Sequence, residues 1–230
     1  MKEKNVKKKK IRIRYNRIII FLIIILLIVF FIFYITNLRI NKIEIKNNDN
    51  IILNEQDIIK IANLSNDSKT FQNLSMKIKS NLENNSYILS AKVTKKNLTD
   101  VYIEINENYP LLFNSINNKT ILFDGTEVSE QFNNIPSIVN YVPESKYTEL
   151  VKKFQKINKE IITRISQIEY SPNDYDDERF LLFMNDGNYT FINLYKFELL
   201  NKYLEVIENF GNKKGILYLD SGNYFEIKEN

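Results

Sequence analysis

Residues 101–110 read VYIEINENYP. Within them the apolar residues Val101, Ile103 and Ile105 alternate strictly with other residue types. This period of two is that of a β-strand with one buried face. Tyr102 and Glu104 fall on the other face, so the stretch predicts a half-buried strand at 101–105.

The sequence before this strand predicts four further elements. Residues 38–45 alternate loosely, and Asn54 has the character of a helix N-cap in front of a short apolar-striped segment. Two helices packed on one face of a three-stranded sheet would bury these apolar stripes. The predicted elements are a strand at 38–45, a short helix after Asn54, a helix at 74–82 and a strand at 88–95.

The sequence after Pro110 is richer in strand signals. Asp124-Gly125 and the run 185–188 (Asn-Asp-Gly-Asn) are turn sequences between apolar runs. Together the patterns predict a second α+β domain with a mainly antiparallel sheet. Its predicted elements are a strand at 121–123, a helix at 146–164, a strand at 165–170, a hairpin of 180–184 with 189–192, a helix at 197–210 and a closing hairpin of 216–219 with 224–227.

Residues 18–35 read IIIFLIIILLIVFFIFYI, without a charge, a glycine or a proline. At about 1.5 Å per residue, these 18 residues span roughly 27 Å, which is close to the hydrocarbon thickness of a bilayer. A buried core helix and a cleavable signal peptide are the alternatives. A signal peptide has a shorter apolar run and small residues at its cleavage site, which residues 34–39 lack. We therefore predict a retained transmembrane helix at 18–36.

The charge is distributed unevenly around this helix. Residues 1–17 contain nine Lys and Arg but one acid, a net +8, whereas the whole chain carries +4 and the remainder therefore −4. By the positive-inside rule, the basic tail stays in the cytoplasm and residues 37–230 lie outside the cytoplasmic membrane. The tail could also bind a cytosolic partner or anionic lipid, but its role in topology is sufficient. No nucleic-acid partner is expected.

The composition excludes several kinds of chemistry. The chain has no Cys, no His and no Trp. It therefore has no disulfide, thiol nucleophile, Cys-type zinc site or Ser-His-Asp triad. We expect no cofactor and no metal, and any enzymatic activity would depend on carboxylates, Lys, Tyr or hydroxyl groups.

The strand–helix–helix–strand–strand order beyond an anchor resembles a POTRA domain. The stretch 101–110, with Glu107 and Pro110 in an E-x-x-P step, is similar to the FtsQ/DivIB family of bacterial division proteins. Later motifs are similar to the β domain of that family. The resemblance implies a cytoplasmic tail at 1–17, a transmembrane helix at 18–36, a POTRA domain at 37–108 and a β domain at 109–230. The later motifs are Asp124-Gly125, I-S-x-I at 165–168, M-x-D-G at 184–187, L-x-K-Y at 200–203 and K-G-I with S-G-x-Y-F at 214–225.

This resemblance implies a non-enzymatic scaffold of the divisome at the division septum. Such proteins bind single-pass coiled-coil proteins of the FtsB/DivIC and FtsL types and help to control septal peptidoglycan synthesis. The physical mechanism would be addition of a partner strand to a sheet edge, for which the last strand is a candidate. The partner-binding residues that the resemblance implies are Tyr218, Leu219, Ser221, Gly222, Tyr224, Phe225 and Ile227.

Other interpretations remain open at this point. The residues of the last hairpin could be ordinary strand core and turn, and Leu217-Tyr218-Leu219 departs from the charged residue that the family often has there. An envelope enzyme could use Glu107 or the acidic run Asp174, Asp176, Asp177 and Glu178, although a structural hinge and a solvated loop explain them better. A POTRA-bearing transport or assembly factor would need barrel strands after the POTRA unit.

Overall fold

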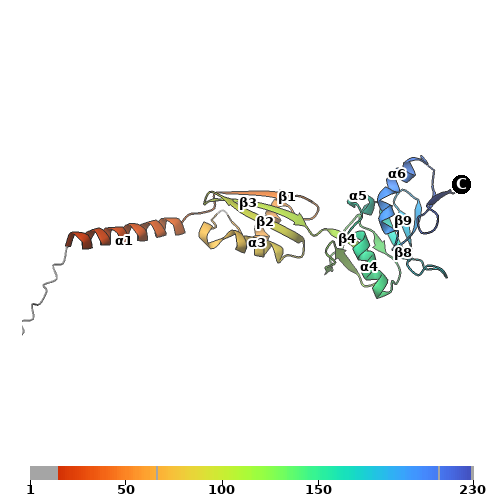
Figure 1. Ribbon diagram of the computed structural model, residues 1–230, viewed down its shortest axis with the longest axis horizontal. Helices are drawn as coiled ribbons and strands as arrows, with labels where there is room; N and C mark the ends of the chain where they lie inside the picture. The colour runs from red at the N-terminus through yellow and green to blue at the C-terminus, as the bar shows by residue number, and fades with distance from the viewer. Residues whose placement is uncertain (1–14, 66, 212, 229–230) are drawn as a thin grey trace, which may run out of the picture. The chain divides into compact units, whose positions relative to one another are not determined.

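The computed structural model describes residues 15–65, 67–211 and 213–228 (Figure 1). Most of the predicted basic tail lies outside the described residues. The chain forms two compact units. The first contains the described residues up to Lys46 with 55–82 and 92–104, and the second contains the described residues of 47–54, 83–91 and 105–230.

Helix α1 runs from Tyr15 to Thr36 and contains the apolar run. Its 22 residues make it about 33 Å long, so it is long and apolar enough to cross a membrane. None of its side chains is buried within the protein. At its C-terminal end, the Thr36 hydroxyl donates to the Ile32 carbonyl (2.9 Å) and the Asn37 amide donates to the Phe33 carbonyl (2.8 Å). The bond from Asn37 satisfies the Phe33 carbonyl, which is one of the last four carbonyls of the helix.

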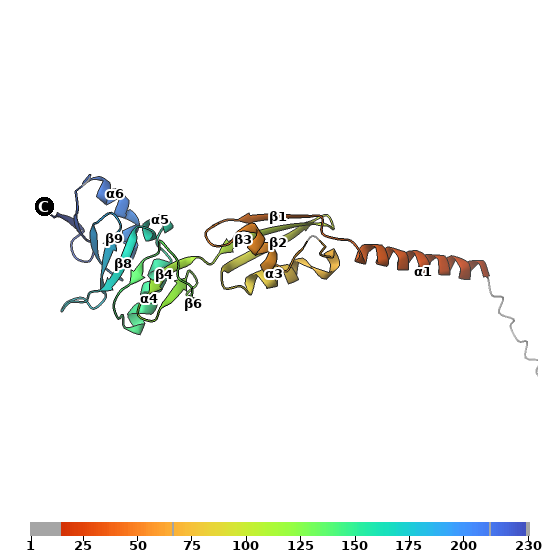
Figure 2. The same ribbon diagram turned by 180° about the vertical axis from the view of Figure 1, so that it is seen from behind.

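The β-α-α-β-β order predicted for the region after α1 is present. In the described residues a three-stranded sheet has the order β1-β3-β2, and α3 runs alongside it (Figures 1 and 2). Val101, Ile103 and Ile105 of β3 are at most 1% exposed, which confirms the strict alternation read from the sequence. The elements are β1 (Lys42–Asn47), α2 (Glu55–Ile61), the 3-10 turn η1 (Thr70–Gln72), α3 (Ser75–Glu83), β2 (Ile88–Lys96) and β3 (Asp100–Glu107).

The first strand begins later than the alternation predicts, at Lys42 rather than Leu38. The residues before it pair with other segments. The Leu38 carbonyl accepts the Thr70 N–H (2.9 Å), and the Ile40 N–H donates to the Ser68 carbonyl (2.8 Å). Backbone groups engaged in this way cannot extend the ladder of the sheet.

The second unit is built around a sheet that has nine strands within the described residues. Its order is β12-β11-β10-β9-β8-β7-β4-β5-β6. Pairing is parallel at β10/β11, β4/β7 and β7/β8 and antiparallel at the other contacts, so the sheet is mainly antiparallel as predicted. The strands are β4 (Pro110–Asn114), β5 (Lys119–Leu122), β6 (Glu127–Val128), β7 (Ser137–Ile138), β8 (Ile165–Tyr170), β9 (Arg179–Met184), β10 (Tyr189–Asn193), β11 (Gly215–Tyr218) and β12 (Tyr224–Ile227).

The prediction of one helix at 146–164 is wrong, because the segment forms α4 (Glu144–Phe154) and α5 (Lys159–Ile162). Between them, the Ile157 N–H bonds to the carbonyl three residues earlier, that of Phe154 (3.0 Å). The Asn158 N–H instead donates to the side-chain carbonyl of Asn201 (2.8 Å). A partner distant in sequence thus takes the donor that a continuous helix would need.

The helix predicted at 197–210 is also interrupted. Residues Phe197–Lys202 form the 3-10 segment η2, and only Tyr203–Glu208 form the α-helix α6. In a 3-10 segment, residues three apart lie in one line. Phe197, Leu200 and Tyr203 have this spacing, and all three are fully buried. Burial of this line of side chains accounts for the tighter winding.

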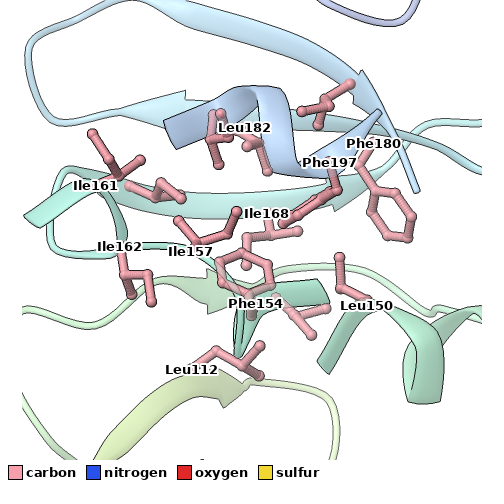
Figure 3. Packing of buried hydrophobic residues seen from close by; sticks show 14 of the residues in the cluster. Leu112, Leu150, Phe154, Ile157, Ile161, Ile162, Ile168, Phe180, Leu182 and Phe197 are labelled. Atoms are coloured by element: carbon pink, nitrogen blue, oxygen red, sulfur yellow. The ribbon is translucent and has the colours of Figure 1, made fainter. Parts of the chain in front are cut away.

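One hydrophobic cluster holds the sheet of the second unit to its helices. Phe154 of α4 lies in the cluster with Ile168 of β8 and Phe197 of η2 (Figure 3). The Phe154 and Phe197 ring centroids are 5.0 Å apart. Aromatic pairs at this separation add about 0.5–1.5 kcal/mol to the contribution of their buried area. The cluster fixes the strands whose outer end forms the candidate site.

Candidate functional site

The C-terminal hairpin forms one end of the large sheet. β12 pairs antiparallel with β11, from Tyr218 opposite Tyr224 to Gly215 opposite Ile227. Among the described residues, β12 has a strand neighbour on one side only, and it lies next to the C-terminal end of the chain in Figure 1. A strand with one neighbour presents a row of backbone groups to which another strand can pair.

The ladder defines which residues of β12 direct their backbone groups outward. The Lys228 N–H donates to the Lys214 carbonyl (2.9 Å), so this is a hydrogen-bonded pair. Hydrogen-bonded and non-hydrogen-bonded pairs alternate along an antiparallel ladder. Phe225 and Ile227 are therefore non-hydrogen-bonded positions, and their N–H and C=O groups point away from β11. These two residues offer the backbone of the edge.

The side chains of the seven sequence-predicted residues differ in exposure. Leu219 is 5% exposed and belongs to the core, whereas Tyr224 (50%) and Ile227 (41%) are exposed. Phe225 is half-buried, with its ring 4.6 Å from that of Phe210. The hairpin thus combines core residues with an exposed edge. The remaining predicted residues are Tyr218, which is half-buried, and Ser221 and Gly222, which are exposed in the turn.

A ladder of stacked side chains crosses the sheet toward this edge. The Arg179 guanidinium of β9 lies 3.6 Å from the Phe191 ring centroid of β10. Phe191 stacks on Tyr218 of β11 (5.4 Å, 24°), and Tyr218 stacks on Tyr224 of β12 (4.6 Å, 16°). Burial, assisted by the Glu226 carboxylate, raises the pKa of Tyr218. The exposed ring of Tyr224 is the outer end of a preorganised surface.

An ion pair holds the turn between β11 and β12. The Arg179 Nε lies 2.7 Å from the Asp220 carboxylate, and the two side chains are 15% and 9% exposed. Lys196 donates to the backbone carbonyl of Asp220 (3.0 Å). Because the same Arg179 also stacks on Phe191, one residue links the turn to the aromatic ladder. Asp220 supplies a charged contact immediately after the uncharged sequence Leu217-Tyr218-Leu219.

A second, buried network supports the start of β11. The Asn188 side chain accepts the Gly215 N–H (2.9 Å) and donates to the Tyr203 hydroxyl (3.2 Å), which donates to Asp186 (2.8 Å). Burial, more than the bond to Asp186, raises the pKa of Tyr203. Gly215 has no room for a side chain, because an added Cβ would lie 2.0 Å from the Glu226 carbonyl oxygen. The hairpin is therefore closely fitted to the sheet.

Glu107, the candidate general acid, is a buried carboxylate in the second unit with a different set of neighbours. It is 1% exposed and accepts the backbone N–H groups of Ile51, Ile52 and Leu53 at 3.0, 2.8 and 2.9 Å. The Asn47 amide donates to it as well (2.5 Å). A carboxylate that accepts four hydrogen bonds organises a loop, and this arrangement supports a structural role.

The acidic run after β8 is engaged by its own loop and by residues of α4 and β10. Asp176 accepts the Glu178 N–H (2.9 Å) and the Asn193 amide (2.9 Å). Glu178 and Asp177 both pair with Lys146, at 2.8 and 3.2 Å. Within residues 15–65, 67–211 and 213–228, no group of three or more acidic side chains is arranged to hold a metal ion.

Sequence reasoning missed the residues that support the edge. Arg179 and Asp220 are 41 residues apart, and Phe191 meets Tyr218 through parallel pairing of β10 with β11. The only sequence signal for these contacts is that three predicted strands each contain an aromatic residue, namely Phe191, Tyr218 and Tyr224. Nothing in that pattern gives the pairing of the strands.

Comparison with known proteins gives a consistent result. The POTRA domain of FtsQ type matches residues 38–108. The cell division protein DivIB of Listeria monocytogenes is 25% identical over 97% of this chain and 85% of its own length. DivIB of Bacillus subtilis is 22% identical over 91% of this chain and 83% of its own. The cell division protein FtsQ of Rickettsia bellii is 29% identical over 45% of this chain and 41% of its own.

The solved structures that are similar include the major extracytoplasmic domain of the trans isomer of DivIB from Geobacillus stearothermophilus. The match covers 43% of this chain and 89% of that one, at 15% identity and a TM-score of 0.37.

Proposed function

Since this chain belongs to the FtsQ/DivIB family of bacterial cell division proteins, we propose that it acts as a divisome scaffold through protein–protein contacts. Its homologues support a role in cell division. The finer proposal is that it binds single-pass coiled-coil proteins of the FtsB/DivIC and FtsL types. Through them it would help to control septal peptidoglycan synthesis.

The single observation that carries this proposal is the open edge of β12. Phe225 and Ile227 direct backbone groups outward, and Tyr224 is 50% exposed beside them. A partner segment in extended conformation would add a tenth strand to the sheet, with backbone hydrogen bonds for affinity and side-chain contacts for specificity. The partner-binding residues proposed are Tyr218, Leu219, Ser221, Gly222, Tyr224, Phe225 and Ile227, of which Leu219 would act from the core.

The proposed location follows from α1 and the charge pattern. An apolar helix near the N-terminus and the DivIB homologues suggest a single-pass membrane protein with an extracellular domain. The basic residues before the helix support an orientation with the N-terminus in the cytoplasm. We propose that the remainder lies outside the cytoplasmic membrane and gathers at the division septum.

Co-purification of the full chain with defined partners tests the proposal. The full chain and a version that ends at Gly222, and so lacks β12, would be coexpressed with the FtsB/DivIC-type and FtsL-type proteins of the same genome. We expect the full chain to retain both partners and the shortened chain to lose them while it keeps its near-native circular dichroism. Retention of both partners by the shortened chain would contradict the assignment to β12.

A separate assay addresses the enzymatic alternative. The purified full chain would be incubated with peptidoglycan, and soluble fragments would be measured by chromatography. We expect no release above that of a boiled sample. Hydrolysis that Glu107→Gln abolishes would overturn the scaffold proposal.

A further inference from the structure

The residues directly after α1 are hydrogen-bonded to a second segment, residues 69–70. Leu38, two residues after the end of α1, accepts the Thr70 N–H (2.9 Å). The Lys69 ammonium donates to the side chain of Asn37 (3.0 Å). A third connection joins Asn41, whose N–H donates to the Thr99 carbonyl (2.9 Å). The η1 region and the β2–β3 turn are thus held next to the exit of the helix.

This fastening limits how far these segments can lie from the membrane. Two residues span at most about 7 Å, and one hydrogen bond brings Thr70 within roughly 12 Å of the end of α1. If α1 crosses the hydrocarbon core, its end lies at the boundary of the headgroup layer, which is about 5–8 Å thick on each side. Thr70 therefore lies in or next to that layer whatever the orientation of the helix.

The two fastened segments carry exposed apolar side chains. Phe71 is 40% exposed, Leu74 58% and Met76 85%, and Leu98 in the β2–β3 turn is 52% exposed. We call these four residues the juxtamembrane patch. Single exposed apolar residues are ordinary on a protein surface, but these four belong to the segments tied to Leu38 and Asn41. Side chains of this kind are stabilised when they enter the boundary between headgroups and acyl chains.

Positive charge surrounds the same residues. Residues 68–82 contain Lys69, Lys77 and Lys79 and no acid, although residues 18–230 carry a net −4. Lys95 and Lys96 precede Leu98. The acids next to these segments are Asp67, which pairs with Arg39, Glu83 at the end of α3, and Asp100. Ammonium groups beside apolar side chains match a layer of anionic phosphates over acyl chains.

The backbone under the patch is held in place by its own hydrogen bonds. The Lys95 ammonium donates to the Thr70 carbonyl (2.8 Å), and the Asn73 amide donates to the Lys69 carbonyl (2.9 Å). Asn73 is 9% exposed, and Thr70 is 3% exposed. The exposed side chains of Phe71, Leu74 and Met76 thus project from a segment that the protein itself orders.

We propose that the juxtamembrane patch is a lipid-contact surface that rests on an anionic phospholipid bilayer, the one that α1 crosses. The apolar side chains enter the headgroup boundary, and Lys69, Lys77 and Lys79 contact lipid phosphates. Through this contact the membrane restrains the first unit at a second point besides α1. The surface is separate from β12, so it does not depend on the proposed partner binding.

The absence of cysteine from the sequence makes a direct test possible. Met76→Cys and Tyr195→Cys introduce single labelling sites at positions that are 85% and 84% exposed in the protein. The full chain, labelled with an environment-sensitive fluorophore, is reconstituted in vesicles of phosphatidylcholine with phosphatidylglycerol, and quenching by aqueous acrylamide is measured. We expect at least threefold weaker quenching at position 76 than at position 195.

The controls change the charge of the lysines, the charge of the lipid and the ratio of protein to lipid. Lys77→Glu with Lys79→Glu should restore quenching at position 76 to within about twofold of that at position 195, as should vesicles of phosphatidylcholine alone. Equal quenching at both positions in the anionic vesicles would overturn the proposal. Protection of position 76 that is equally strong in both kinds of vesicle would overturn it as well. Protection that disappears when the ratio of protein to lipid is lowered would also overturn it, because it would indicate contact with a second copy of the chain.

Discussion

The two edge strands of the large sheet, β12 and β6, differ in length and in the residues around them. β12 has four residues in register with β11, and its outer side has no strand neighbour among the described residues. β6 at the other end has two residues, Glu127 and Val128, paired with β5. Both are edges by topology, but only β12 offers a continuous run of backbone long enough for strand addition.

The chain after β6 closes that end with side-chain bonds. The Thr120 hydroxyl donates to the Glu130 carbonyl (2.6 Å), and Lys119 donates to the Ser129 hydroxyl (2.7 Å). The Gln131 amide donates to the side chain of Asn118 (2.9 Å). The comparison indicates that the neighbouring residues, and not position in the sheet alone, decide whether an edge is available to a partner.

Glu107→Ala has the largest expected effect, and it separates stability from edge binding. The change leaves the N–H groups of Ile51, Ile52 and Leu53 without the carboxylate that accepts them, which costs about 3 kcal/mol of unfolding free energy. Chemical denaturation of the full chain in lipid discs would measure it. At denaturant concentrations below the unfolding midpoint of the variant, partner retention should remain normal. A loss smaller than that of Glu107→Gln would contradict the assigned role.

Gly215→Val tests the fit of β12 onto β11. The new Cβ would lie 2.0 Å from the Glu226 carbonyl oxygen, so β12 must move, at a cost of about 2–3 kcal/mol and with loss of partner retention. Gly125→Ala, in the turn before β6, is the matched control. Its φ of +93° makes alanine unfavourable by about 1 kcal/mol, but it has open space and should not affect partner retention. Equal binding defects in the two variants would remove the distinction between the edges.

Ile227→Pro removes one outward-facing N–H from β12. Proline is tolerated at the free side of an edge strand, so stability should change by less than about 1 kcal/mol. Partner affinity should fall about tenfold, as measured by titration with the purified partner. Glu127→Pro is equivalent at β6, because the Leu122 N–H bond to the Thr126 carbonyl makes Glu127 the outward-facing residue there. If Glu127→Pro weakened binding and Ile227→Pro did not, the partner would bind at β6 rather than at β12.

Tyr224→Ala has the smallest expected effect, because it shortens the aromatic ladder without changing the backbone of the edge. The loss of one stacked ring that contacts a partner corresponds to about 1 kcal/mol, or roughly fivefold in affinity. Tyr195→Ala, at a position that is 84% exposed, should leave the affinity unchanged. The two titrations would be run side by side, and indistinguishable affinities would exclude Tyr224 from the interface.

Local sequence was sufficient wherever one short segment sets its own pattern. The apolar run in α1, the alternation of Val101, Ile103 and Ile105 and the turn at 185–188 were all predicted and are present. In each case the periodicity or turn chemistry belongs to residues that are neighbours in sequence. The same reasoning identified the last hairpin and the POTRA order.

Tertiary structure alone decided the contacts between distant segments. The Asn201 side chain accepts the Asn158 N–H, 43 residues earlier, between α4 and α5. Arg179 pairs with Asp220, and Glu107 accepts N–H groups 54 to 56 residues away. A sequence pattern reports which face of an element is apolar, but the register and order of the strands decide which polar groups meet. For this protein, the sequence determined most of the elements and their apolar faces, because these depend on neighbouring residues. The tertiary contacts determined where the helices break and that β12, rather than β6, is the open end of the large sheet among the described residues.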